Sequence, residues 1–357
     1  MQIGWIHVVD FRNYRTLEYS PTPRLNLLIG PNAQGKTNLL EALGMLIAGR
    51  SFRTSRLAEM PRWGVEGSTI SGELVRGDGS AGRRVVHRTL TKREDDRWQN
   101  AGESVEWARV IAFGWQDLEI INGAPGARRN FIDGFAGRLY PTHLAALVRY
   151  RQILARRNRL LQQQHAHGDD AAARLQPWNE QLAAVGMELM DRRRKAVAAL
   201  QTELARIYRA LSTTRSKVEV RYRTALGEAT EPAALLAALN RTQRAELRRG
   251  QTLVGPHRDD LAIEIDGVDA RAFASRGQQR LVALVLRLAE VLPVAEAAGT
   301  APVLLLDDAL SELDPGVREL VLRELGAAEQ VFLTSPETLA VKGAAVFQVN
   351  AGGIAPV

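Results

Sequence analysis

The sequence predicts a mixed α/β fold that is built around a phosphate-binding loop and interrupted by a helical arm. Residues 30–37 form a glycine-containing loop between an apolar run and a helical pattern, and a second apolar run ends in Asp307 and Asp308. Between these features the middle third of the chain has helical periodicity. The expected segments are an N-terminal head part at 1–139, the arm at 140–251 and a C-terminal head part at 252–357.

The composition is that of an ordinary globular protein. The chain has 357 residues, of which 45% are hydrophobic and 24% are charged, and it contains no cysteine. Disulfides, thiolate-bound zinc, iron–sulfur clusters held by cysteine and thiol catalysis are therefore excluded, and a cytoplasmic protein is expected. The first residues lack a signal-peptide pattern, and no run approaches the roughly 18 apolar residues of a membrane span.

The N-terminal head part is expected to contain short strands around the first helix. The apolar run 25–29 has the pattern of a buried strand, and the helical pattern of 38–46 follows the loop. Residues 68–91 and 110–113 are expected to form further strands.

The arm is predicted from apolar residues at helical spacing. One periodic stretch covers 147–161, polar residues 165–170 break it, and a longer helix is expected over 174–211. Pro177 is expected in the first turn of that helix, where a proline is tolerated. These two helices would form an antiparallel arm, and alternation at 218–222 then predicts a strand.

The C-terminal head part returns to α/β character. Residues 261–265 alternate as a strand, and a helix is expected over 278–298. The continuous apolar runs at 303–306 and 331–333 are typical of parallel strands that are covered on both faces.

The positive charge is concentrated in the middle of the chain. The whole chain has a net charge of +7, whereas residues 141–250 carry 20 Lys and Arg against 10 Asp and Glu, a net of +10. A polyanion such as nucleic acid is a natural partner for such a segment. Solvated helix faces would give the same excess, so charge alone leaves both interpretations open.

The phosphate-binding loop carries the most direct chemical signal. Its glycines let backbone N–H groups close around phosphates at a helix N-terminus, where the helix dipole favours anions. Lys36 would reach the β- and γ-phosphates, and Thr37 would bind Mg²⁺. The residues expected to bind ATP are Gly30, Pro31, Asn32, Ala33, Gln34, Gly35, Lys36, Thr37 and Asn38.

Two carboxylates follow the second buried strand. A carboxylate there is costly to desolvate unless a cation or a proton partners it, so Asp307 is expected to hold Mg²⁺, directly or through water. Asp308 lies where a hydrolytic water would be oriented, and we expect it to be catalytic together with Lys36. A helix N-cap is the alternative role for Asp308.

A third segment indicates the class of nucleotide-binding protein. Residues 275–280 read Ser-Arg-Gly-Gln-Gln-Arg before a long helix. Set between the phosphate loop and the second strand, the segment resembles the signature loop of ABC-type ATPases. In those proteins a serine and a helix N-terminus of one subunit meet the γ-phosphate that the other subunit binds. The resemblance implies nucleotide contacts from Ser275, Gly277 and Gln278.

Together the motifs resemble those of the RecF proteins of bacterial recombinational repair, nearly from end to end. They lie at residues 11–14, 30–42, 49–54, 123–125, 128–133, 157–158 and 255–260. The resemblance implies an ABC-type ATPase head, similar to that of SMC proteins, and a homodimer that sandwiches two ATP molecules. It also implies ATP-dependent binding to double-stranded DNA and single-strand gaps, and cooperation with RecR and RecO in loading RecA.

Several positions depart from the related patterns or extend them. Gln116 stands in Gly-Trp-Gln-Asp-Leu where the family has Ser-Pro-Glu-Asp-Leu, and we expect it to contact Mg²⁺ or water. Arg276 replaces a signature glycine, and Thr334 with Ser335 occupies the place of a transporter switch histidine. We therefore expect slow, DNA-stimulated hydrolysis that times dimer and DNA release. Arg12 is expected near the nucleotide, as a basic residue is in related ATPases.

Three further residues fit more than one role, and two other protein classes were considered. Arg128 and Arg129 would fit DNA phosphates or a solvated surface, and His257 would fit a nucleotide or partner contact or a turn. An ABC transporter subunit is disfavoured because the separation between Thr37 and Ser275 in the sequence is much longer than in transporter subunits. The alternative from a different class is a scaffold that binds DNA and RecR, with the nucleotide as a folding ligand only.

Overall fold

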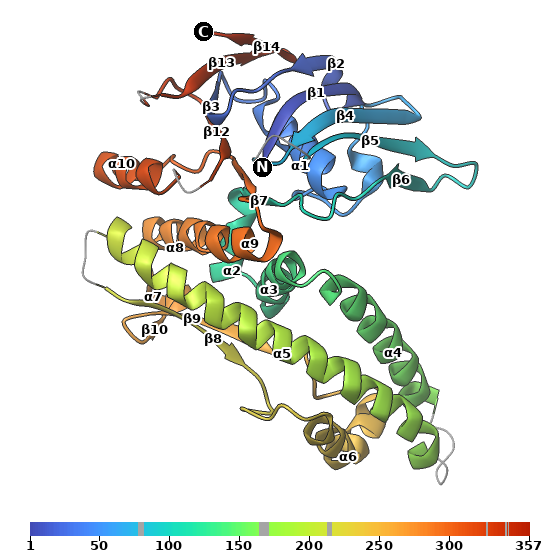
Figure 1. Ribbon diagram of the computed structural model, residues 1–357. Helices are drawn as coiled ribbons and strands as arrows, with labels where there is room; N and C mark the ends of the chain where they lie inside the picture. Colours follow the sequence, from blue (N-terminus) through green and yellow to red (C-terminus); the bar gives the residue numbers. More distant parts are fainter. Residues whose placement is uncertain (78–81, 164–170, 213–215, 326–327, 340, 342) are drawn as a thin grey trace. The chain divides into compact units, whose positions relative to one another are not determined.

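The computed structural model describes residues 1–357 except 78–81, 164–170, 213–215, 326–327, 340 and 342. The chain folds into two compact units, each made of segments that are separate in sequence (Figure 1). Unit 1 comprises Met1–Leu118, Arg206–Arg215 and Ser275–Val357, and unit 2 comprises Glu119–Ala205 and Ser216–Ala274.

The segment boundaries expected at 139/140 and 251/252 both fall inside unit 2. The reason is a contact between distant segments. Helix α3 (Pro125–Leu139) packs against strand β9 (Asp260–Ile265), so both belong to the same compact unit as the arm between them.

Unit 1 contains a mostly parallel sheet that carries the phosphate loop. Its order is β14-β13-β3-β12-β11-β7, and only β14 runs antiparallel to its neighbour. The strands are β3 (Arg24–Ile29), β7 (Val110–Phe113), β11 (Val303–Leu306), β12 (Gln330–Ser335), β13 (Ala345–Asn350) and β14 (Gly353–Pro356). The expected parallel pairing of the two apolar runs is confirmed in β11 and β12, whose side chains are all buried.

A second sheet of unit 1 is antiparallel and has the order β2-β1-β4-β5-β6. Its strands are β1 (Gln2–Phe11), β2 (Tyr14–Tyr19), β4 (Gly67–Val75), β5 (Arg83–Lys92) and β6 (Trp98–Gly102). Helix α1 (Lys36–Ala48) contacts strands of both sheets, and ten of its thirteen residues are buried. One hydrophobic core therefore covers α1 and both sheets, which fixes the helix N-terminus at the phosphate loop.

The remaining helices of unit 1 are short. They are η1 (Leu57–Glu59), η2 (Trp115–Leu118), α8 (Arg276–Leu288), α9 (Val291–Ala298) and α10 (Pro315–Glu324). The prediction of a single helix over 278–298 is wrong, because the chain forms the two helices α8 and α9 instead. Pro293 explains the break, since a proline lacks the amide hydrogen of a helix interior and is accommodated in the first turn of α9.

Unit 2 consists mainly of long helices with one small sheet of order β10-β9-β8. Its other elements are α2 (Glu119–Asn122), α4 (His143–Gln163), α5 (Ala171–Leu211), β8 (Val218–Arg223), α6 (Pro232–Arg249), β10 (Val268–Asp269) and α7 (Ala270–Phe273). The last residues of α5 belong to unit 1. Buried side chains of α4, α5 and α6 form the core of this unit.

Helix α5 of the arm contains a proline at a position that differs from the one expected. Pro177 lies inside α5 and not in its first turn. Ala173, whose carbonyl group would pair with the missing proline amide, is exposed, so water is available to that carbonyl. The break expected at 165–170 lies outside the described residues.

Among the helices that are described, none is both long and apolar enough to cross a membrane.

Candidate nucleotide site

The loop of residues 30–37 joins β3 to α1 and requires its two glycines. Gly30 and Gly35 have positive φ angles of 146° and 113°. A Cβ atom at Gly30 would lie 2.3 Å from the carbonyl oxygen of Val349, and one at Gly35 would lie 2.8 Å from the Tyr14 hydroxyl. Larger residues are therefore excluded by sterics as well as by backbone conformation.

Residues outside the loop hold its backbone. The Tyr14 hydroxyl donates to the Gly35 carbonyl at 3.0 Å, and Asn13 Nδ2 donates to the Gln34 carbonyl at 3.3 Å. The side-chain oxygen of Gln34 accepts a hydrogen bond from the Ala351 amide at 2.8 Å. The turns between β1 and β2 and between β13 and β14 thus preorganise the loop for a phosphate.

Lys36 supplies the positive charge of the loop. It is the first residue of α1, and its ammonium group donates to the carbonyl oxygens of Gly30 and, at 2.8 Å, Pro31. Burial lowers the pKa of the Lys36 ammonium, while the carboxylates of Asp307 and Asp308 oppose that shift. A phosphate at the loop would give this ammonium an anionic partner in place of neutral carbonyls.

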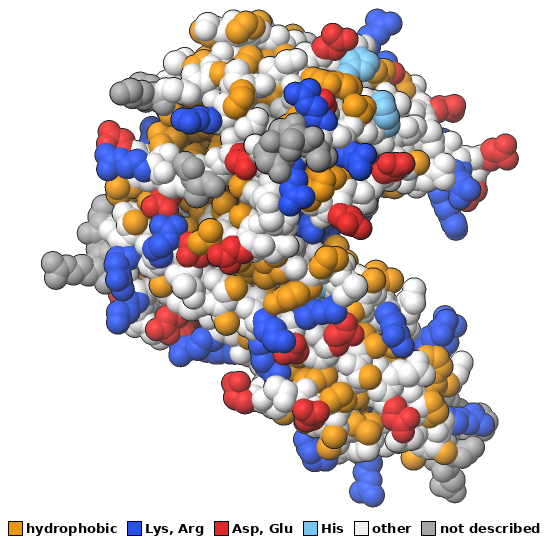
Figure 2. All heavy atoms as spheres, in the orientation of Figure 1, with side chains coloured by type: hydrophobic (Ala, Val, Ile, Leu, Met, Phe, Trp, Pro, Cys, Tyr) orange, Lys and Arg blue, Asp and Glu red, His pale blue; other side chains and the backbone are white. Residues whose placement is uncertain are grey.

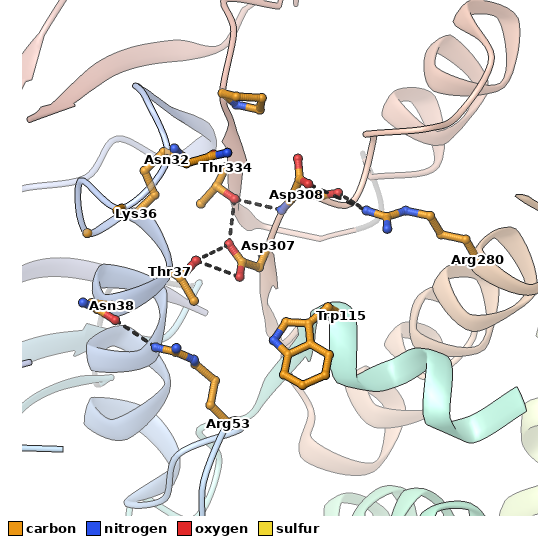
Figure 3. A pocket seen from close by; sticks show the side chains of 13 residues that line it. Asn32, Lys36, Thr37, Asn38, Arg53, Trp115, Arg280, Asp307, Asp308 and Thr334 are labelled. Atoms are coloured by element: carbon orange, nitrogen blue, oxygen red, sulfur yellow. Dashed lines mark hydrogen bonds and ion pairs between the residues drawn. The ribbon is translucent and has the colours of Figure 1, made fainter. Parts of the chain in front are cut away.

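Asp307 has the surroundings of a Mg²⁺ ligand. It follows β11, and Figure 3 shows the hydroxyl groups of Thr37 and Thr334 pointing at its carboxylate from two different elements. The oxygen–oxygen distances are 2.9 Å from Thr37 and 2.8 Å from Thr334. Burial raises the pKa of the Asp307 carboxyl, and these two hydrogen bonds oppose the rise.

The donor set around Asp307 fits a magnesium ion. Mg²⁺ prefers oxygen ligands and is usually held by one or two carboxylates together with substrate phosphates. A half-buried carboxylate whose side-chain hydrogen bonds come from the neutral hydroxyl groups of Thr37 and Thr334 gains from such a cation. Within the described part of the chain, no group of three or more His, Asp or Glu residues offers a separate metal site.

Asp308 is held in a strained backbone conformation beside Asp307. Its φ angle is +51°, in the left-handed region that non-glycine residues rarely adopt. The side chain is 53% exposed and lines the pocket. A half-exposed carboxylate there can orient a water molecule and accept its proton. Asp308 does not begin a helix, so the alternative N-cap role is wrong; Asp314 occupies the cap position of α10.

These residues surround a pocket of about 380 Å³, which is within the usual size range of ligand sites. The sequence-predicted residues that line it are Asn32, Ala33, Gly35, Lys36, Thr37, Asn38, Asp307 and Asp308. The other lining residues were not among the predicted nucleotide contacts, and they are Arg53, Trp115, Arg280, Thr334 and Pro336. The loop and the two carboxylates are therefore brought together from segments about 270 residues apart.

Some predicted residues lie outside the lining. Gly30, Pro31 and Gln34 shape the loop through the contacts described above. Gln116 lies in η2 next to Trp115, and the Trp115 side chain faces the pocket in its place.

Arg12 also lies outside the lining, because Glu41 engages it. The buried carboxylate of Glu41 accepts two hydrogen bonds from Arg12, at 2.7 and 2.8 Å, and one from Arg53 at 3.1 Å. Arg53 also donates to Asn38 at 2.8 Å. Glu41 therefore orients the Arg53 guanidinium at the pocket. Glu41 stands within the otherwise apolar run 39–47, and an acidic residue in such a run could have indicated a buried charge partner.

The signature segment caps helix α8. The Ser275 hydroxyl accepts from the Gln278 amide at 3.3 Å, and the Gln278 side chain accepts from the Ser275 amide at 2.9 Å, which forms a capping box. Ser275 and Gly277 are exposed and do not line the pocket of their own chain. The exposed N-terminus of α8 is a helix end of the kind that favours anions.

Two of the arginines considered for DNA binding are engaged inside unit 2. Arg128 forms a bidentate ion pair with Asp260 at 2.7 and 2.9 Å. Arg129 donates to the Asp259 carbonyl at 2.9 Å. Both contacts join α3 to the start of β9, so these arginines stabilise the unit.

His257 has a structural role in the same unit. Its Nε2 lies 3.2 Å from the Thr252 carbonyl, which can only accept, so Nε2 carries the hydrogen. Nδ1 then accepts from the Tyr150 hydroxyl at 2.7 Å. Burial lowers the pKa of His257 to about 4, which keeps the ring neutral in this arrangement.

The fold and the site define a P-loop nucleotide-binding head of the ABC type. A sequence profile of the RecF/RecN/SMC N terminal domain matches residues 2–351. The chain is 36% identical to the DNA replication and repair protein RecF of Heliobacterium modesticaldum, over 99% of this chain and 98% of that protein. It is 35% identical to the RecF protein of Synechococcus sp., over 100% and 98%. The chain belongs to the RecF family.

Solved structures agree with this assignment. The chain is similar to the recombination mediator protein RecF-ATP of the RecFOR pathway, with a TM-score of 0.87 and 28% identity over 99% of this chain and 97% of that one. An Smc head bound to the C-winged helix domain of ScpA has a TM-score of 0.57 and 13% identity, over 100% and 97%. The second likeness concerns the fold alone.

Proposed function

We propose that this chain is an ATP-dependent DNA-binding protein of recombinational repair that works as a homodimer. It binds double-stranded DNA and single-strand gaps, and it helps RecO and RecR to load RecA. Weak, DNA-stimulated ATP hydrolysis times the release of the dimer and of DNA. The likeness to a recombination mediator of the RecFOR pathway, solved with ATP, supports this function.

The single observation that carries the proposal is the separation, within one chain, of two parts that the sequence predicts to bind nucleotide. The loop, Asp307 and Asp308 line one pocket, whereas Ser275 at the exposed N-terminus of α8 does not line it. A serine and helix end that are open to solvent can meet the γ-phosphate of a second copy. ATP would then bridge two chains, each supplying one part of each site.

The residues of one chain divide the chemistry among them. Bound Mg²⁺ would supply charge neutralisation at the phosphate oxygens. Lys36 binds the β- and γ-phosphates, and Asp307 and Thr37 would hold the Mg²⁺ ion. Asp308 orients the attacking water and accepts its proton.

Mixed dimers test whether the two parts act across chains. When one chain carries Lys36→Ala and the other carries Ser275→Arg, both lesions fall in one composite site and the second site stays intact. When both changes are on one chain and the partner is wild type, each site is damaged once. We expect ATP-dependent DNA binding to survive in the first arrangement and to fall sharply in the second.

The measurement uses two affinity tags, so that only the heterodimer is assayed. The two arrangements contain the same substitutions in the same number, and each is therefore the control for the other. Equal activity in both would contradict an ATP sandwich between two chains.

The basic excess of the arm is only partly available to DNA. Arg157 and Arg193 are buried in ion pairs with Glu246 and Asp133. The run at 192–194 is therefore not one open patch. Figure 2 shows Lys and Arg side chains spread over this part of the molecule, with Asp and Glu between them.

The exposed arginines of α6 are the better candidates for phosphate contacts. Arg241, Arg244 and Arg248 are exposed and spaced by three and four residues, which places them on one face of the helix. A row of guanidinium groups at this spacing fits successive phosphates of a nucleic-acid backbone.

Replacing these three arginines with Gln is expected to flatten the salt dependence of DNA binding. Each lost phosphate contact removes about 0.9 from the slope of log affinity against log salt, so the triple variant should lose about 2.7. Titrations of duplex DNA between low and moderate salt measure the slope. Arg323→Gln on α10 is the matched control for an exposed arginine. An unchanged slope in the triple variant would assign α6 to another surface.

A further inference from the structure

Arg280 joins the signature helix to the segment that carries Asp308. Its Nη2 atom donates to the Asp308 carbonyl and, at 2.6 Å, to the Ser311 hydroxyl oxygen. The same atom lies 4.0 Å from the Asp308 carboxylate. The Arg280 side chain is only 11% exposed, and Figure 3 shows it reaching from its helix toward Asp308 at the edge of the pocket.

Asp308 is clamped from its other side by Thr334. The Thr334 hydroxyl accepts from the Asp308 amide at 2.8 Å and donates to the Asp307 carboxylate at 2.8 Å. The left-handed backbone of Asp308 is therefore fixed between Thr334 on β12 and Arg280 on α8. A strained conformation persists only where its surroundings hold it in this way.

We infer that Arg280 is a positioning residue for Asp308 and couples the N-terminus of α8 to water activation. The inference rests on the proposed function. Ser275 caps the same helix five residues earlier, so the two residues move as one rigid element. Contact of Ser275 with the γ-phosphate of the second copy would thus set the place of the Arg280 guanidinium and, through it, of the Asp308 carboxylate.

The step that Arg280 supports is ordinary hydrolysis. The water oxygen forms a bond to the γ-phosphorus while the bond from that phosphorus to the β–γ bridging oxygen breaks, and the electron pair of that bond stays on ADP. Asp308 accepts the proton of the water. Arg280 lines the edge of the pocket, and in this scheme it acts through the backbone and carboxylate of Asp308.

A double-mutant cycle tests the inference. Arg280→Gln should lower kcat about 10- to 100-fold and leave the Kd for ATP almost unchanged, because the phosphate loop is intact. In an Asp308→Asn background the same change should have almost no further effect on single-turnover hydrolysis, because the group that Arg280 positions is already disabled. Arg280→Lys should recover part of the loss, since it keeps a donor but not the planar fork.

The controls separate this inference from the proposed function and from misfolding. Arg323→Gln removes an exposed arginine of unit 1 and should leave kcat unchanged. A wild-type chain without hydrolysis would contradict the proposed function itself. With wild-type hydrolysis present, a normal kcat in Arg280→Gln, or an equal loss in the Asp308→Asn background, would overturn the positioning role. ATP affinity and the thermal midpoint of unfolding, measured for Arg280→Gln and Arg280→Lys, would reveal a folding defect. If both quantities fall together with kcat, the positioning role of Arg280 is overturned.

Discussion

Asp308→Asn should lower kcat for ATP hydrolysis at least about 100-fold while ATP binding is retained. Asparagine keeps the size of the side chain and its backbone contacts with Thr334 and Arg280, but it cannot accept the proton of the attacking water. The phosphate loop, Lys36 and Asp307 are untouched. The ATP-bound dimer should therefore persist much longer than that of the wild-type chain.

Single-turnover hydrolysis and equilibrium nucleotide binding measure the two quantities separately. Glu319→Gln, an exposed carboxylate on α10, is the matched control and should change neither. An Asp308→Asn chain that hydrolyses ATP at the normal rate would remove Asp308 from the mechanism. One that no longer binds ATP would make Asp308 a binding residue.

Glu246→Ala should lower the free energy of unfolding by about 3–5 kcal/mol. Glu246 on α6 and Arg157 on α4 form an ion pair at 2.6 Å, and both side chains are fully buried. Arg157 also donates to Asn179 on α5 and to Thr252, each at 2.7 Å. Removing the carboxylate leaves a buried guanidinium without its charge partner in the middle of three helices.

Urea unfolding followed by circular dichroism measures this loss. Asp191→Ala removes a half-exposed carboxylate that pairs with Lys195 on α5, and it should cost less than about 1 kcal/mol. If the two variants lose the same stability, the buried ion pair does not hold the helices of unit 2 together.

The phosphate loop and the two carboxylates could be predicted because their signals are local. Two glycines at fixed spacing, an apolar run before them and a helical pattern after them all fall within residues 25–46. The run at 303–306 with its two following carboxylates is equally compact. Such patterns report backbone conformation and burial directly, and the structure places both at one pocket.

Residues that join the site through long-range contacts carried no such signal. Thr334 could be placed in the sequence only as a replacement for a switch histidine, and its hydrogen bonds to Asp307 and to the Asp308 backbone form only when the strands pair. Arg53 reaches the pocket through its contacts with Glu41 and Asn38, which its own neighbours in the sequence do not indicate. The net charge of 141–250 left two interpretations open for a related reason, since Arg193 contributes to the basic excess but is buried against Asp133.

We propose that ATP gates DNA binding by this chain. Fluorescence anisotropy with a labelled gapped duplex tests it most directly, with ATP and with ADP at one fixed salt concentration and with Arg323→Gln and Asp308→Asn chains beside the wild type. The account predicts tight binding with ATP, weak binding with ADP, and prolonged binding with ATP for Asp308→Asn. Equal binding in both nucleotide states, or none in either, would contradict it.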